Sequence, residues 1–150
     1  MSQRGWRAVA WAACAAYIVA AAALVLWPSG ESVRQLLLRV YLFGLYDLGV
    51  PPSVSPEVYA AVGNVLLLLP GTWALVVLLG RSRWPWVTAV GLFGGVGAES
   101  AQALLSAHRL FEWGDIAANV SGALLGVALG AGTDRWLQRR ASLRQATTAR

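Results

Sequence analysis

Apolar residues in this chain gather into long runs that polar residues interrupt at only a few positions. Each of four such runs is about 20 residues long, the length at which a helix rising about 1.5 Å per residue crosses a ~30 Å hydrocarbon layer. The runs predict four transmembrane helices, at residues 8–27, 58–79, 85–105 and 116–133. The pattern therefore predicts an all-α integral membrane protein.

The connection at residues 28–57 has a different pattern. Four polar side chains share one face of a helix drawn through it: Glu31, Arg34, Gln35 and Arg39. The opposite face is apolar, which predicts an amphipathic interfacial helix over about residues 31–46. A fifth span here would bury two of these arginines together with Asp47, so we do not predict one.

The arginines predict the orientation. Two precede the first run, two lie in the turn near residue 82 and five follow the fourth run, against three on the other side. Both termini are therefore predicted to be cytoplasmic. The first run could instead be a cleaved signal peptide, but it is longer than a usual signal core and ends at Trp27, so we expect it to be retained. Residues 1–133 then form one transmembrane domain, and residues 134–150 form a basic cytoplasmic tail whose short helix lies on anionic headgroups.

Composition narrows the class of protein further. The chain is 57% hydrophobic and 13% charged, with a net charge of +5 carried by arginine alone. Because the arginines form no patch interleaved with exposed aromatic residues, we expect no nucleic-acid partner. The single Cys14 excludes an intrachain disulfide or a cysteine-based metal site. The lack of lysine, with abundant Ala, Arg and Gly, indicates a GC-rich coding sequence, and we place the protein in a bacterial cytoplasmic (inner) membrane.

A few polar residues interrupt the runs at one depth. Asn64, Glu99 and Asn119 each lie within about 10 Å of the predicted outer interface, and Arg109 and Asp115 lie in or beside the connection above them. A carboxylate in hydrocarbon costs at least about 2.5–3.5 kcal/mol, so Glu99 must be paired, hydrated or protonated. Arg109 is its nearest candidate partner.

This cluster has two interpretations. It could fasten the helices together, with Gln102 as a further member and each polar link contributing about 0.6–2 kcal/mol. It could also line a cleft that binds a ligand, which is the interpretation we favour. Small residues and one proline are expected to shape the helix packing: Pro70, Gly91, Gly95, Gly122 and Gly126. Pro70 predicts a kink, and the glycine stripes of the third and fourth spans are expected to face each other.

Catalytic chemistry has weaker support in the sequence. Ser100 and Ser106 have no nucleophile signature around them, and His108 is best interpreted as a solvated loop residue. A metal site would need carboxylate and amide oxygens. We therefore assign no catalytic residue, no metal and no cofactor.

The order and spacing of these residues, over about residues 58–130, resemble the VanZ-like family of bacterial membrane proteins. The matching elements are Asn64 with the following LLLLPG, Glu99-x-x-Gln102, Arg109, Asp115-x-x-x-Asn119, Gly122 and Gly126. Two features depart from the family pattern: Gly71 follows Pro70 directly, and the GGVG run replaces a serine often found before the glutamate. The resemblance implies a multi-span protein of the cell envelope, in a family whose namesake is associated with low-level teicoplanin resistance.

Two functions follow from the cluster and the resemblance. The first is binding of an envelope lipid, a lipid-linked envelope precursor or a lipoglycopeptide in an outer-leaflet polar cleft, with an effect on glycopeptide tolerance. The alternative is a membrane enzyme that acts on a lipid-linked envelope substrate through Glu99 and Asp115.

Overall fold

A computed structural model describes residues 3–25, 30–105 and 112–148 of the 150-residue chain. All regular elements in these ranges are helices, as the sequence predicts. They are α1 (Gln3–Val25), α2 (Gly30–Tyr46), α3 (Pro56–Leu79), the 3₁₀ turn η1 (Arg81–Arg83), α4 (Trp84–Leu105) and α5 (Trp113–Thr148). The predicted helices at 31–46, 58–79 and 85–105 agree with α2, α3 and α4 to within two residues.

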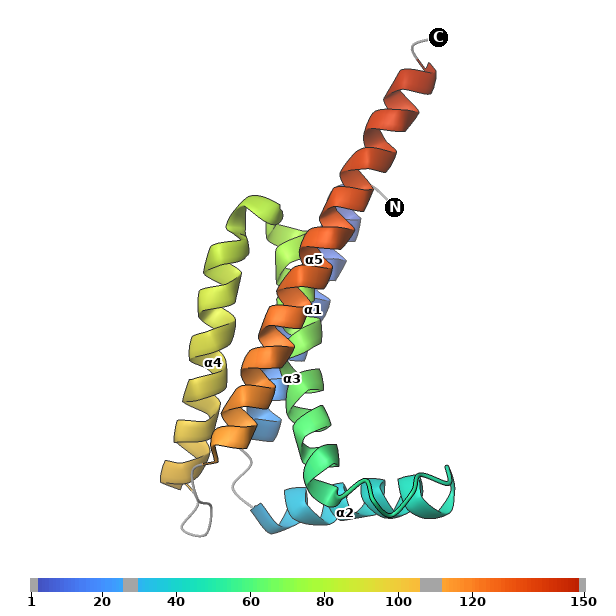
Figure 1. The fold of residues 1–150 in the computed structure, drawn as a ribbon. Coiled ribbons are helices and arrows are strands. Elements are labelled where there is room, and N and C mark those ends of the chain that lie inside the picture. Colours follow the sequence, from blue (N-terminus) through green and yellow to red (C-terminus); the bar gives the residue numbers. More distant parts are fainter. Residues whose placement is uncertain (1–2, 26–29, 106–111, 149–150) are drawn as a thin grey trace.

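Four of the helices run alongside one another, and α2 lies across one end of them (Figure 1). Both ends of the chain and the α3–α4 turn are at the opposite end from α2. The most extensive contact is between α3 and α5, and α4 packs on α5. The end of α4 and the start of α5 lie at the same end as α2 (Figure 1).

Three helical segments are long and apolar enough to cross a membrane: Gly5–Val25, Pro56–Leu79 and Trp113–Leu143. The predicted third span, α4, is not among them in the described part of the chain. Its hydropathy is reduced by four glycines and by Glu99, all between residues 91 and 99. The structure thus gives three candidate spans and a fourth long helix packed beside them.

The fourth predicted run differs most from the structure. Helix α5 begins at Trp113 and continues without interruption to Thr148, so the residues after 133 do not form a separate short helix as predicted. No proline interrupts this segment, and side chains four residues apart support it. Gln138 donates to Asp134 at 2.8 Å, and the guanidinium of Arg140 lies 3.8 Å from the ring centroid of Trp136.

A pair of polar contacts joins α5 to the α3–α4 turn. The Asp134 carboxylate accepts the backbone N–H of Arg81 at 3.2 Å, and the Trp73 indole donates to the Thr133 hydroxyl at 3.1 Å. Gly80 precedes this turn with a φ of +85°, a conformation that favours glycine. These contacts fix the register of α3 and α5 at the end that carries both termini.

The proline in α3 is accommodated by a side chain from α1. Pro70 lacks an N–H, so the carbonyl of Leu66, four residues earlier, loses its helical donor. The Tyr17 hydroxyl donates to this carbonyl at 3.1 Å and to that of Leu67 at 3.0 Å. A neighbouring helix thus supplies a donor for the freed carbonyl, and the contact also fixes α1 on α3.

The glycines of α5 face α3, which differs from the predicted contact with α4. A Cβ at Gly122 would meet the carbonyl of Val65, one at Gly126 would meet the Leu69 carbonyl and Thr72 Oγ1, and one at Gly130 would lie 2.7 Å from Val76 Cβ. These side-chain-free positions let the two helix backbones approach closely. The α4 stripe instead meets Ala123 and Asn119 of α5, which neighbour the glycines on the helix surface.

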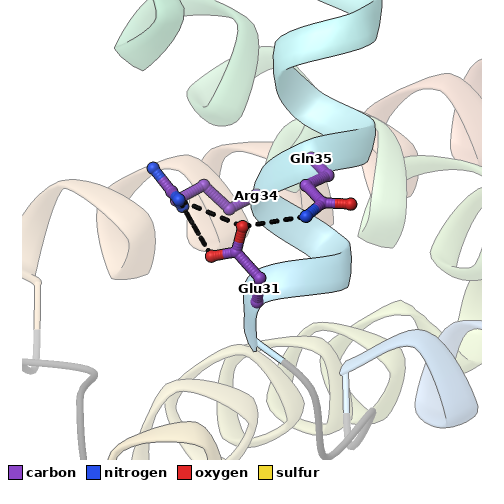
Figure 2. A network of polar contacts seen from close by, with 3 residues as sticks. All are labelled: Glu31, Arg34 and Gln35. Carbon is purple, nitrogen blue, oxygen red and sulfur yellow. Dashed lines mark hydrogen bonds and ion pairs between the residues drawn. The ribbon is translucent and has the colours of Figure 1, made fainter.

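Helix α2 carries its polar residues together near its start (Figure 2). Glu31 forms an ion pair with Arg34 at 2.9 Å and accepts a hydrogen bond from Gln35 at 3.0 Å. These hydrogen bonds, first from Gln35 and then from Arg34, lower the pKa of the exposed Glu31 carboxyl. At its other end α2 contacts α3 through Tyr41, whose ring meets that of Tyr59 edge to face at 5.5 Å.

Candidate functional site

The register between α3, α4 and α5 brings the predicted polar residues to one level. A Cβ at Gly95 would lie 3.0 Å from Asn119 Cβ and 3.4 Å from Leu68 Cδ1, so these three positions are level with one another. Helix α4 runs opposite to α3 and α5 (Figure 1). Asn64 of α3, Glu99 of α4 and Asp115 of α5 are each four residues from these positions, toward the end of α4 and the start of α5. The same register therefore places these three residues at one level, one helical turn away.

Glu99 is buried, with 4% of its surface exposed. Its Oε1 accepts the backbone N–H of Glu112 at 3.0 Å, just before the first turn of α5. Glu99 therefore fastens the end of α4 to the start of α5, a contact that agrees with the helix-fastening interpretation of the cluster, although the partner is a backbone N–H and not a side chain.

The structure describes only some residues of the predicted polar cluster. Arg109 lies outside the described residues, as do Ser106 and His108, and Gln102 is placed in α4 without a described side chain. The expected pair between Glu99 and Arg109 therefore stays a prediction. Asn64 and Asp115 are half-buried.

Asn119 is the second fully buried polar member of the cluster, at 4% exposure. Its Oδ1 is buried and has no hydrogen-bond partner among the described residues. Leaving a buried acceptor unpaired costs about 1–3 kcal/mol. A buried amide oxygen without a partner needs an explanation, because an asparagine that served only to join helices would accept a hydrogen bond from one of them.

A cavity of about 410 Å³ lies between α1, α3 and α4, and Asn119 of α5 contributes to its wall. The lining is almost entirely apolar. Gly71, Gly91, Gly94 and Gly97 all contribute to it. A Cβ at Gly94 or Gly97 would meet nothing within 4 Å.

Sequence reasoning did not find this cavity. Its position depends on α1, which contributes Tyr17 and Ala21 to the lining and whose packing partner is not evident from an apolar run. The GGVG run of α4 was a usable signal, because clustered glycines on a spanning helix indicate either close packing or open space. Among the described residues, no three metal-ligating side chains gather at one point.

The fold and the site define a helical membrane protein with an apolar cavity next to a buried polar cluster. Residues 14–132 match the VanZ/LLP1 family, and the chain belongs to this family. No curated protein and no solved structure matches the chain. The family match confirms the resemblance found in the sequence and extends it to most of α1, which forms one wall of the cavity.

Proposed function

We propose that this protein binds an envelope lipid or a lipid-tailed envelope molecule, with the apolar chain in the cavity between α1, α3 and α4. The observation that carries the proposal is the cavity itself, at about 410 Å³ and with an apolar lining. That volume is within the roughly 300–1,000 Å³ of small-molecule binding sites. In a membrane, lipid chains surround such a cavity, and a built apolar recess is suited to holding one of them.

The polar cluster suits the headgroup of the same ligand. Glu99, Asp115 and Asn64 lie toward the α4–α5 connection from the cavity, and that connection contains Arg109. One cation beside carboxylate and amide groups fits a polar or phosphorylated head. Lipid-linked envelope precursors and lipoglycopeptides of the teicoplanin type both combine such a head with an apolar tail. An effect on glycopeptide tolerance is the physiological output that we propose.

The proposal includes a topology of four spans in a bacterial inner membrane, with α4 as the fourth span, α2 on the outer surface and both termini in the cytoplasm. The arginine distribution supports it. In intact cells, a membrane-impermeant maleimide is expected to label Ser53→Cys and to leave Ser82→Cys unlabelled. Cys14, buried in α1, serves as the unreactive background. Labelling of position 82 from outside would contradict this topology.

Filling the cavity tests the proposed function. Gly94→Leu and Gly97→Leu place a side chain where there is room, so the fold is expected to be retained while the cavity is lost. The matched control is Gly63→Leu, because Gly63 is an exposed α3 position with the same free space and does not line the cavity. The probe is a phosphatidylglycerol with a diazirine in its acyl chain, and the readout is the yield of photoadducts on cavity-lining residues.

We expect adducts on the lining of the wild type and of Gly63→Leu, and a loss of about fivefold or more in the two filled variants. Teicoplanin tolerance of an expressing strain should fall in the same two variants, with membrane abundance unchanged on a quantitative blot. Equal adduct yields in all four proteins would contradict the binding proposal. Chemical conversion of a lipid-linked envelope substrate by the purified protein would favour the enzyme alternative instead.

A further inference from the structure

We propose that the occupant of the cavity carries a hydrogen-bond donor, a hydroxyl or an amide N–H, on its apolar chain, and that Asn119 accepts this hydrogen bond. The inference rests on the proposed function, because it requires that the cavity holds a chain. It adds the chemical feature by which the protein would select one chain over another.

The first observation is the state of the Asn119 side chain. It is 96% buried, since 4% of its surface is exposed, and its Oδ1 has no hydrogen-bond partner among the described residues. The same side chain belongs to the wall of the cavity. A buried amide beside an otherwise apolar recess is the arrangement by which binding sites fix the orientation of a ligand.

The second observation concerns the other polar side chains in the wall. Within the described part of the chain, Tyr17 and Thr72 are the only lining residues besides Asn119 with a polar side chain. The Tyr17 hydroxyl donates to the carbonyls of Leu66 and Leu67, and the Thr72 hydroxyl donates to those of Leu68 and Leu69 at 2.9 and 3.2 Å. Both hydroxyl protons are therefore used within the helices. Among the described residues of the lining, no side chain supplies a proton to Asn119, and we assign that proton to the occupant.

A water molecule is a poor alternative occupant. A buried water typically makes about three hydrogen bonds, and the nearly apolar lining offers few partners. A ligand that combines an apolar chain with one donor satisfies both the lining and the amide. Because Asn119 is level with Gly95, one turn deeper than Glu99, the donor lies on the chain and not at the headgroup.

The test compares pairs of chains in which a methyl group replaces the donor hydrogen. 1-Dodecanol and dodecyl methyl ether form one pair, and N-methyldodecanamide and N,N-dimethyldodecanamide form the other. Each compound displaces the photoreactive phosphatidylglycerol from the purified full-length protein in detergent. We expect the donor-bearing member of at least one pair to act at about fivefold lower concentration in the wild type, the factor that one net hydrogen bond supplies. The pair that shows the preference distinguishes a hydroxyl from an amide.

Asn119→Leu, which keeps the branched shape and the number of side-chain heavy atoms, is expected to reduce this preference to about one while still binding chains. Thr72→Val is the matched control: it also removes a polar group from the lining, but one whose proton is used within α3, so the preference should persist. A preference that survives in Asn119→Leu overturns the inference. Equal potency within both pairs in the wild type also overturns it, and needs no variant to fold. If no compound displaces the probe, the proposed function fails with it.

Discussion

Gly126→Ala is expected to destabilise the protein severely, although it adds only one methyl group. The added Cβ would meet the Thr72 hydroxyl oxygen and the Leu69 carbonyl, and the carbonyl cannot move away without shifting α3. Overpacking of a rigid contact costs about 1–3 kcal/mol and sometimes more, and we expect the upper end because the obstacle includes backbone. Membrane abundance and the melting temperature in detergent should both fall.

The matched control lies two turns further along the same helix. A Cβ at Gly132 would meet nothing within 4 Å, so Gly132→Ala should be neutral or slightly stabilising. Alanine is preferred over glycine inside a helix by roughly 1 kcal/mol, and this preference applies equally at both positions. If the two variants melted at the same temperature, the close approach of α3 and α5 at Gly126 would be refuted.

Tyr17→Phe is expected to cost about 1–2 kcal/mol, because it leaves the Leu66 carbonyl without a donor inside the membrane. The cost should depend on Pro70. In Pro70→Ala, the new backbone N–H can bond to that carbonyl, so removal of the hydroxyl should then cost less than half as much. The measurement is a double-mutant cycle on melting in detergent or on unfolding in a titrated denaturant.

Tyr46→Phe controls for the loss of a phenolic hydroxyl, since the Tyr46 side chain is 78% exposed at the end of α2. It should leave stability nearly unchanged. Additive effects of Tyr17→Phe and Pro70→Ala would show that the hydroxyl and the proline act independently, against the contact described here.

The helices were predictable because long apolar runs leave few choices. The end of α5 was not, because a run of apolar residues marks where a helix can be buried and not where it stops. The segment after Thr133 is polar, yet it has no proline, and contacts such as that between Asp134 and Gln138 continue the helix. Polarity alone was the wrong criterion for a boundary.

The candidate site was predictable in depth but not in its contacts. The cost of burying charge agrees with the burial of Glu99. Counting residues placed Glu99 at the level of Asn64 and Asn119, whereas the register of the helices puts it level with Asn64 and Asp115, one turn from Asn119. The cation nearest in sequence was the natural partner to expect, whereas the described contact is the backbone N–H of Glu112. A backbone donor cannot be recognised from residue types.

The sequence also did not reveal which helix each glycine stripe contacts. Positions four residues apart advance by about 40° around a helix of 3.6 residues per turn, so Gly122, Gly126 and Gly130 sweep across a wide sector. Helix α5 contacts both α3 and α4 within that sector. The glycines meet α3 and the adjoining Asn119 and Ala123 meet α4. Spacing reveals a face but not which helix covers it.

Because α5 is one unbroken helix, a small tilt of it produces a large displacement at its far end. About 29 residues separate Asn119 from the end of the helix at Thr148, a length of about 44 Å at 1.5 Å per residue. A tilt of about 10° around the level of Asn119 would displace the far end by about 8 Å, several times the shift of any side chain at the cavity. A distance probe on the arginine-rich end of α5 would therefore report small adjustments of this helix at the level of Asn119.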